Sequence, residues 1–434
     1  MSAPSESLGR FFNGKKILIL GFGREGRSTL SMIKKTAPDA EVAVADMNAV
    51  DPGCPGIKVY SGERYMDALA DGFDVVMKTP GIAFLDVTVP DGTLVTCQND
   101  LFLRFRACHA VGVTGTKGKT TTSTLIYRIL REAGVDARLF GNIGVPPFEE
   151  LDAPENCVAV IEMSSHQLEF TRTSPDVAVL TNIYEEHLDH YATGFAGYAD
   201  AKLNIARYQT GDGVFIYNGD EFADGFPRPL ETKAKMVPVR STDALPVPED
   251  FYNPHLRGAH NRFDMLIASR AAAVFGAGDD AAARAFAAFE GIEHRMEYVG
   301  RVRGIDFYND AIATIPMAAL SAMDAIPETA TLIVGGMDRG IDYKPLTDGL
   351  LDRKPVNLIC MPDTGYTIGD TLEAAGYAGN IIRAADMQAA VDAAFDVTPE
   401  GKVCLLSPAA ASYNVYKNFE YKGKDFKEKV LGHG

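Results

Sequence analysis

Short apolar runs recur along the chain, and most of them end in glycine or in a polar residue. They cover residues 16–20, 41–45, 74–77, 110–113, 158–161, 177–180, 214–217, 305–308, 331–334, 356–361 and 403–406. Short apolar runs bounded by turn residues are typical of buried β-strands. The stretches between them favour helices, so the sequence predicts an α/β fold in which strands and helices alternate.

The clearest helix follows the run at 110–113. Its apolar residues recur at helical spacing and share one face; they are Leu125, Ile126, Ile129 and Leu130. Strands connected by such helices pair in parallel and carry their ligands at the carboxyl ends of the strands. Candidate chemistry is therefore expected just after each apolar run.

The runs form three groups, which predicts three domains in a chain of 434 residues. We expect a Rossmann-like N-terminal domain over residues 1–106 and a central domain over residues 107–291 with a P-loop ATPase-like parallel or mixed sheet. A second Rossmann-like domain is expected over residues 292–434. The sequence shows no short repeat and no low-complexity linker.

A glycine pattern follows the first apolar run, at Gly21, Gly23 and Gly26. Asp46 ends the second run, 25 residues after Gly21. A glycine turn, a helix N-terminus and a later acidic residue are the elements of a dinucleotide fingerprint. The pattern alone leaves NAD, another diphosphate nucleotide and plain packing open. Thr79 begins a further turn that is expected over the same edge of the sheet.

A second glycine loop lies between the run at 110–113 and the amphipathic helix. Its residues are Gly115, Thr116, Lys117, Gly118, Lys119, Thr120 and Thr121. Backbone N–H groups of such a loop surround phosphate oxygens, Lys119 can reach the β- and γ-phosphates, and Thr120 can bind Mg²⁺. Val113 stands where the commonest form of the motif has glycine. The loop predicts a nucleoside triphosphate site, the alternative being a glycine turn that only opens a helix.

Three polar residues of the middle segment are candidates for the same site. Glu162 directly follows a strand, so its carboxylate should emerge opposite the phosphate loop and could bind Mg²⁺, or it is a solvated strand end. His187 follows the neighbouring strand and is a candidate ligand, although single histidines often serve in packing. Spacing alone makes Lys202 a solvent-facing helix lysine.

Two polar loops follow strands of the last segment. Asp310 comes after the run at 305–308, and Arg339 comes shortly after the run at 331–334. Arg339 could bind a carboxylate with two parallel hydrogen bonds, or it is an exposed loop arginine.

Composition narrows the class of protein further. The formal net charge of −16 argues against a nucleic-acid-binding surface. The six cysteines are scattered, without the paired spacing of a zinc site, and suit reduced thiols. No signal peptide or membrane-spanning apolar stretch is evident, so we expect a cytoplasmic protein without membrane insertion.

Taken together, these residues resemble the Mur ligases, ATP-dependent amino-acid ligases of peptidoglycan precursor synthesis. The resemblance covers essentially the whole chain. Its motifs are the phosphate loop, Gly141-Asn-Ile-Gly144, Glu162-Met-Ser-Ser-His-Gln-Leu-Glu169, Glu186-His-Leu-Asp189, Ala201-Lys202-Leu203, Gly258-Ala-His-Asn261, His294-Arg-Met-Glu297, Asn309-Asp310, Gly335-Gly336, Ser407-Pro-Ala409 and Lys417-Asn-Phe-Glu420.

The resemblance implies a UDP-linked substrate, UDP-N-acetylmuramoyl-L-alanine, and glutamate as the second substrate of a monomeric enzyme. It places Gly23, Arg24, Asp46, Thr79, Asn142, Gln167 and His187 at the UDP substrate, so that the first domain would hold UDP and not NAD. It places the phosphate loop with Asn261, Arg295 and Asp310 at ATP.

The resemblance also implies the catalytic set Lys119, Glu162, His187 and Lys202. Thr120, Glu162, His187 and a carbamylated Lys202 would bind two Mg²⁺ ions, which replaces the solvent-facing interpretation of Lys202. The implied reaction passes through an acyl phosphate that the glutamate amine attacks.

The amino-acid site departs from the family pattern. Thr314, Arg339, Ser412 and Phe419 are implied at this site. Ala311 and Ile312 replace the usual Ser-Lys, so D-glutamate is an expectation, and L-glutamate, another amino acid or a catalytically silent nucleotide-binding protein stay open. Folylpolyglutamate synthesis and an NAD-dependent dehydrogenase are further alternatives. The first does not account for the N-terminal glycine pattern, and the second leaves the phosphate loop unexplained.

Overall fold

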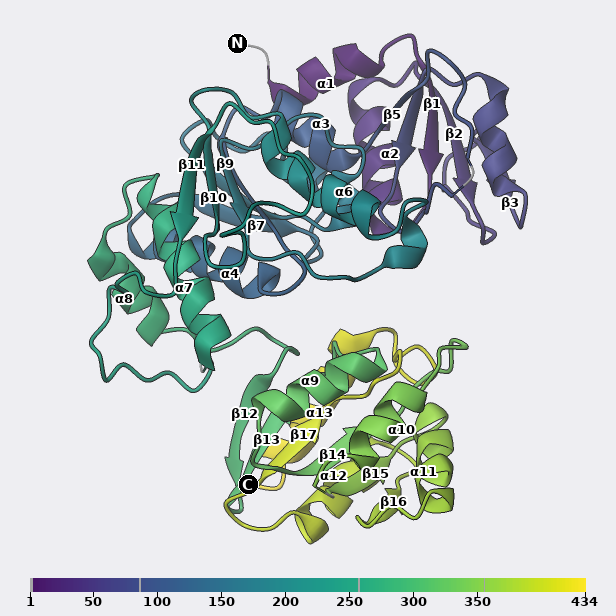
Figure 1. Ribbon diagram of the computed structural model, residues 1–434. Coiled ribbons are helices and arrows are strands. Elements are labelled where there is room, and N and C mark those ends of the chain that lie inside the picture. The colour runs from purple at the N-terminus through teal and green to yellow at the C-terminus, as the bar shows by residue number, and fades with distance from the viewer. Residues whose placement is uncertain (1–2, 86, 257, 355) are drawn as a thin grey trace. The chain divides into compact units, whose positions relative to one another are not determined.

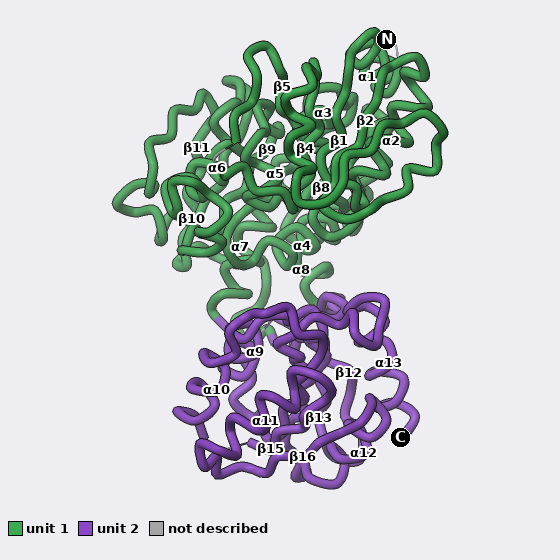
Figure 2. The backbone as a smooth tube through the Cα atoms, turned by 90° about the vertical axis from the view of Figure 1, so that its right-hand side faces the viewer, with its two compact units in different colours: residues 1–251, 259–287 green, residues 252–258, 288–434 purple. Residues whose placement is uncertain are grey.

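The computed structural model describes residues 3–85, 87–256, 258–354 and 356–434. The chain forms two compact units, one of residues 1–251 and 259–287 and one of residues 252–258 and 288–434 (Figure 2). Three sheets with helices packed around them make up these units (Figure 1), so the predicted α/β class is confirmed. No helix among the described residues is both long and apolar enough to cross a membrane.

The first sheet has the order β3-β2-β1-β4-β5, and all its neighbouring strands are parallel. Its strands are β1 (Lys16–Leu20), β2 (Glu41–Asp46), β3 (Lys58–Ser61), β4 (Val75–Lys78) and β5 (Leu94–Thr96). Its helices are α1 (Pro4–Phe12), α2 (Arg24–Thr36), α3 (Gln98–Phe105) and the 3-10 helix η1 (Tyr65–Asp71). The three strands predicted from hydropathy, β1, β2 and β4, form the centre of this sheet.

The second sheet is also entirely parallel, in the order β11-β10-β9-β6-β8-β7. Its strands are β6 (His109–Thr114), β7 (Ala137–Gly141), β8 (Val158–Glu162), β9 (Val177–Leu180), β10 (Val214–Asn218) and β11 (Lys235–Val239). The helices are α4 (Lys119–Glu132), α5 (Ser165–Leu168), α6 (Phe195–Arg207), α7 (Gly258–Ala273) and α8 (Asp279–Ala287), with the 3-10 helices η2 (Pro147–Glu150) and η3 (Leu188–His190). The predicted apolar face of α4 is buried.

Apolar and ionic contacts hold these two sheets together as one unit. The rings of Phe102 and Phe140 lie 5.1 Å apart within a core to which both sheets contribute. The buried ammonium of Lys78 on β4 lies 3.2 Å from the carboxylate of Glu169, which follows α5. The predicted division of this unit near residue 106 therefore separates two sheets that share a core.

The third sheet makes up most of the second unit, in the order β12-β13-β17-β14-β15-β16. Its strands are β12 (Glu297–Val302), β13 (Ile305–Asn309), β14 (Thr329–Val334), β15 (Asn357–Cys360), β16 (Ile381–Arg383) and β17 (Val403–Leu406). Its helices are α9 (Pro316–Ala325), α10 (Lys344–Leu351), α11 (Thr364–Ala374), α12 (Met387–Val397) and α13 (Phe419–Leu431). The sheet is mixed because β12 pairs with β13 in the antiparallel direction.

Candidate active site

The phosphate loop joins β6 to α4 and is shaped by two glycines with positive φ. Gly115 has φ +157°, and a side chain there would lie 1.8 Å from Oγ1 of Thr181. Gly118 has φ +82°, and a side chain there would lie 2.5 Å from Oδ1 of Asp264. Glycine is required at both positions because conformation and space each exclude a Cβ atom. The predicted strand–loop–helix arrangement is confirmed.

Two lysines converge on one carbonyl oxygen of this loop. Lys119 Nζ donates to the Gly115 oxygen at 2.9 Å, and Lys202 Nζ donates to the same oxygen at 2.7 Å. Lys202 is only 1% exposed, so the solvent-facing interpretation from spacing was wrong. Burial, followed by the nearby charge of Lys119, lowers the pKa of Lys202 well below its ordinary value.

Glu162 ends β8 next to the phosphate loop, as predicted. It pairs in register with Val113 of β6 and with Gly141 of β7, so its side chain emerges at the carboxyl edge of the sheet. The carboxylate is 2% exposed; one oxygen accepts from Asn142 Nδ2 at 2.7 Å, and the other has no hydrogen-bond partner among the described residues. Such an oxygen is suited to bind a cation.

The described residues contain no group of three or more His, Cys, Asp or Glu side chains arranged to hold a metal ion. A metal ion bound by Glu162 and His187 would therefore need further ligands, which other oxygen groups would have to supply. The hydroxyl of Thr120 is a donor that the loop motif predicts, and a carbamate on Lys202 is one that the family resemblance implies. Oxygen donors of this kind are the ligands that Mg²⁺ prefers, so the residue set fits that ion.

His187 lies in a cluster of three imidazole rings that are tilted to one another. Its backbone has φ +55° at the start of η3, and its ring centroid lies 4.9 Å from that of His166. The His166 ring lies 3.9 Å from His190, whose Nε2 is 3.2 Å from a carboxylate oxygen of Glu169. Burial lowers the pKa of His187, which favours the neutral imidazole that can act as a ligand.

The N-terminal glycine loop has one open position. Gly21 and Gly26 are packed tightly, since a side chain on them would meet Thr79 at 1.9 Å and the Gly21 oxygen at 2.2 Å. No atom lies within 4 Å of a Cβ on Gly23, the residue before α2. This open helix N-terminus suits a phosphate group. Asp46 uses one oxygen to accept from the Phe22 backbone at 2.7 Å, so it also holds the loop in place.

Two hydrogen bonds connect this loop to the edge of the second sheet. Arg24 Nη1 donates to the Gly144 oxygen at 2.6 Å, and Gln167 Nε2 donates to Glu25 at 2.7 Å. Asn142, which holds Glu162, belongs to the same turn as Gly144. The structure thus brings Arg24, Asn142 and Gln167, three of the residues predicted for the UDP substrate, to the side of the metal-binding candidates.

The remaining predicted residues divide between the two units. Asn261 lies on α7 in the first unit, and Arg295 is exposed in the second. Asp310 is 5% exposed and accepts from the Ser407 hydroxyl at 3.0 Å and the Met296 backbone at 3.2 Å. Burial raises its pKa to about 7.

The residues predicted for the amino acid also lie in the second unit. Thr314 is half-buried before α9, and Arg339 is in an exposed loop after β14. Ser412 is 2% exposed, and its hydroxyl has no hydrogen-bond partner among the described residues. Phe419 begins α13, with its ring 6.1 Å from that of His294.

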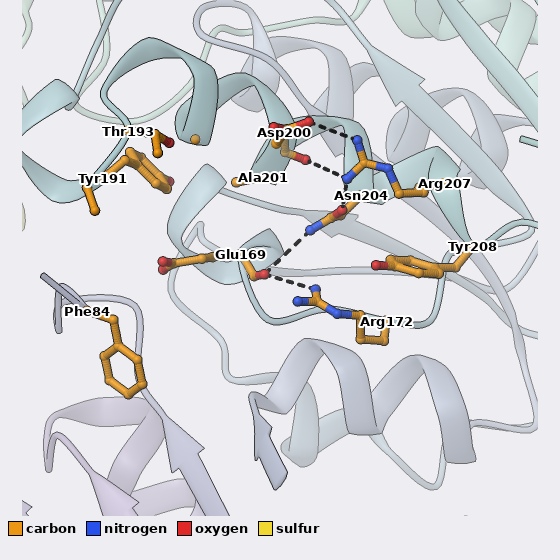
Figure 3. A pocket seen from close by; sticks show the side chains of 12 residues that line it. Phe84, Glu169, Arg172, Tyr191, Thr193, Asp200, Ala201, Asn204, Arg207 and Tyr208 are labelled. Atoms are coloured by element: carbon orange, nitrogen blue, oxygen red, sulfur yellow. Dashed lines mark hydrogen bonds and ion pairs between the residues drawn. The ribbon is translucent and has the colours of Figure 1, made fainter. Parts of the chain in front are cut away.

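A pocket of about 510 Å³ lies beside α6 (Figure 3), and Lys202 is not one of its lining residues. Its lining includes Tyr191, Ala201 and Tyr208. Its two arginines are already engaged, since Arg207 pairs with Asp200 at 3.0 Å and Arg172 donates to the backbone oxygen of Glu169 at 3.0 Å, as the dashed lines in Figure 3 show. Arg172 also donates to the backbone oxygen of Thr171 at 2.9 Å. This pocket therefore does not provide the phosphate-binding charge of the predicted site.

Two residues that support the phosphate loop escaped the sequence prediction. Asp264 lies beneath Gly118 and accepts from Thr122 at 3.1 Å, and the Tyr198 hydroxyl is 2.8 Å from that of Thr116. The only sequence signal is an acidic residue within the apolar stretch of α7. His166 and His190 were also not predicted as site residues, although His166 lies within the motif 162–169 and His190 directly follows the motif 186–189.

One family model and several named relatives match this chain. A family model for the Mur ligase middle domain matches residues 113–238. The UDP-N-acetylmuramoylalanine--D-glutamate ligase of Symbiobacterium thermophilum is 36% identical over 400 residues, 86% of this chain and 87% of the relative. The enzyme of the same name from Ligilactobacillus salivarius is 33% identical over 457 residues, 96% of each chain.

Solved structures share the fold. MurF ligase from Thermotoga maritima, in complex with ADP, has a TM-score of 0.57 at 15% identity and covers 98% of this chain and 97% of its own. UDP-N-acetylmuramate-alanine ligase MurC from the same organism has a TM-score of 0.55 at 17% identity and covers 97% and 100%. These similarities confirm the predicted three-domain type of fold.

The geometry of the phosphate loop predicts unequal effects of two alanine substitutions. Gly118→Ala should abolish the rise in melting temperature caused by ATP with Mg²⁺, because its Cβ atom collides with Asp264 and displaces the loop. Gly134→Ala is a matched control, since Gly134 has φ +78° but nothing within 4 Å of its Cβ position. The control should lose about 1–2 kcal/mol of stability and keep the response to ATP. Equal responses in both variants would contradict the role assigned to Gly118.

Asp264 predicts a pH dependence of stability. Burial raises its pKa to about 8 from an ordinary value of 3.8, opposed by the hydrogen bond from Thr122. The contribution of protonated Asp264 to the free energy of unfolding is complete below pH 3.8. It is lost as the pH rises towards 8, by at most about 1.4 kcal/mol per pH unit. Asp264→Asn should remove this slope, so the variant should gain stability relative to the wild type between pH 5 and pH 7 in denaturant titrations. Parallel stability curves would contradict the assignment.

Proposed function

The chain belongs to the Mur ligase family, and on this basis we propose that it joins D-glutamate to UDP-N-acetylmuramoyl-L-alanine at the expense of ATP, in peptidoglycan precursor synthesis. The relatives at 30–36% identity carry the name of that ligase. The similarity of fold to solved Mur ligases extends over 97–98% of the chain. We further propose that the protein acts as a monomer in the cytoplasm.

The observation that carries this proposal is the arrangement around the carboxyl ends of β6 and β8. Lys119 and Lys202 place two ammonium groups on one loop carbonyl, beside the buried carboxylate of Glu162. Asn142 connects that carboxylate to the side where the UDP substrate would lie. Cationic groups near a phosphate loop and oxygen ligands for a cation are what transfer of a phosphoryl group between two anions requires.

In the proposed reaction, the alanine carboxylate of the nucleotide substrate attacks the γ-phosphorus of ATP, and ADP leaves. The glutamate amine then attacks the carbonyl carbon of the acyl phosphate, loses a proton and displaces inorganic phosphate. The backbone N–H groups of the phosphate loop and Lys119 hold the triphosphate and neutralise its charge. Asn142 and Gln167 orient the end of the nucleotide substrate that reacts.

Thr120, Glu162, His187 and a carbamylated Lys202 would hold Mg²⁺, which neutralises phosphate charge when it is bound. The structure supports the carbamate in one respect. Lys202 is buried beside Lys119, and two ammonium groups on one oxygen repel each other. Conversion of one of them to an anionic carbamate would turn that repulsion into attraction.

The proposed reaction is tested by phosphate release from ATP with UDP-N-acetylmuramoyl-L-alanine and Mg²⁺, with D-glutamate and L-glutamate in parallel and product masses recorded. We expect turnover with D-glutamate. Turnover only with L-glutamate would support the proposed reaction and show that its amino-acid substrate is the L-enantiomer. Silence with both, in a protein whose melting temperature still responds to ATP, would indicate a nucleotide-binding protein without ligase activity.

The carbamate is tested by Lys202→Ala. We expect activity to fall by about two orders of magnitude or more, because an anionic metal ligand is lost. Formate or acetate should then restore part of it by supplying a carboxylate in the space of the missing group. Lys233→Ala, at a lysine that is not part of the site, is the control and should keep full activity. Absence of rescue at any carboxylate concentration would count against the carbamate.

A further inference from the structure

Lys422, on the first turn of α13, is a buried lysine with no counter-ion. It is 2% exposed, and its Nζ donates to the carbonyl oxygen of Gly335 at 2.6 Å. No other side-chain hydrogen bond and no ion pair of Lys422 occurs among the residues that the structure describes. A buried ammonium with only a neutral acceptor is costly, and an anion beside it would offset that cost.

The ammonium lies at the carboxyl edge of the third sheet. Gly335 follows β14, donates its N–H to the Pro408 oxygen after β17 at 2.9 Å, and lies against the Met361 oxygen after β15. Three parallel strands therefore end around the residue that Lys422 contacts. Ligands of open parallel sheets bind outside the carboxyl ends of their strands.

This edge is also a topological switch point. Helices α9, α10 and α11, which follow β13, β14 and β15, pack on one face of the sheet. Helix α13, which follows β17, packs on the other face together with α12. Strand β17 lies between β13 and β14. The helix that follows β17 therefore packs on the opposite face of the sheet from the helices that follow its two neighbours. A crevice forms where neighbouring connections diverge in this way.

A second buried polar group, which has no hydrogen-bond partner among the described residues, lies close by. Met337 N donates to the Ala411 oxygen at 2.7 Å, and Gly336 packs against the same oxygen. Gly335 and Ser412 each adjoin this contact. The Ser412 hydroxyl is buried and has no hydrogen-bond partner in the described part of the chain. A buried hydroxyl and a buried ammonium, both lacking an anionic partner, are suited to hold a carboxylate.

We propose that Lys422 binds a carboxylate of the incoming amino acid and makes the site selective for an anionic one. The inference rests on the proposed ligase function and assigns its specificity. Lys422 would also supply the cation that the amino-acid site needs, since Ala311 and Ile312 carry no charge. Arg339 lies in an exposed loop, where water weakens its interaction with a carboxylate more than in the buried site of Lys422.

A structural lysine that merely ties α13 to the Gly335 carbonyl is the competing explanation, and stability distinguishes the two. If Lys422 is structural, Lys422→Met should lower the melting temperature because a buried carbonyl loses its donor. If Lys422 awaits a carboxylate, the apolar replacement relieves a buried charge, and the melting temperature should stay the same or rise.

The experiment measures steady-state kinetics of the full chain with D-glutamate, L-glutamate and the neutral D-glutamine. Lys422→Met should raise KM for the preferred glutamate by about tenfold or more while KM for ATP and for the nucleotide substrate changes by less than about twofold. Its preference for glutamate over glutamine should fall by a similar factor. Lys422→Arg should recover much of the affinity, because it retains the charge.

Lys424→Met is the matched control, since Lys424 is exposed on the same helix. It should leave all three KM values unchanged. Lys422→Gln provides the same comparison if the methionine variant does not fold. If the wild type is active and its KM for glutamate is the same in Lys422→Met and Lys422→Gln, this inference is overturned. The ligase function would then stand. A wild type inert with every amino acid would instead contradict the ligase function, and the inference with it.

Discussion

The carbonyl oxygen of Gly115 accepts hydrogen bonds from the side-chain nitrogens of Lys119 and Lys202, and the electrostatics of the phosphate loop depend on this contact. Burial and the nearby charge of Lys119 lower the pKa of Lys202, because two ammonium groups at one acceptor repel each other. The arrangement is suited to a phosphate loop because its ligand is highly anionic. Lys119 comes from the helix that begins at the loop, whereas Lys202 comes from α6, which packs beneath it. The site is therefore arranged electrostatically for anions by two elements far apart in sequence.

The same unit couples the two candidate substrate sites. The end of β8 and the segment after it supply Glu162 to the metal-binding candidates, Gln167 to Glu25 of the first sheet, and Glu169 to Lys78. The buried ion pair of Lys78 and Glu169 contributes little net stability, but it penalises any alternative docking of the two sheets, because each charge would then lose its partner. This coupling explains why the two sheets behave as one unit although hydropathy assigned them to two domains.

The second unit shows how a site can be rebuilt without changing the fold. Ala311 stands where the family has serine and is fully buried in an apolar core of this unit. Ile312 stands where the family has lysine and is half-buried. In our proposal Lys422 on α13 supplies the charge that Ile312 lacks. In sequence, Lys422 and Gly335 are separated by 87 residues, so no local pattern connects them.

The sequence by itself determined the central strands and the phosphate loop. All strands predicted from hydropathy lie in the interior of the three sheets, where both faces are buried and the residues must be apolar. The six strands that hydropathy missed, β3, β5, β7, β11, β12 and β16, are the six sheet edges, where one side is free and polar residues are tolerated. The phosphate loop was predictable because the local backbone conformation requires glycine at positions 115 and 118.

Only the tertiary structure decided the environment of the long polar side chains. Spacing on α6 made Lys202 an exposed lysine, yet the packing of that helix under the phosphate loop buries it. Asp264 and Lys422 are buried for the same reason, since each faces a strand or loop end from a distant part of the chain. Burial, charge and pKa depend on which surfaces meet, and that is a property of the packed molecule that a linear pattern does not contain.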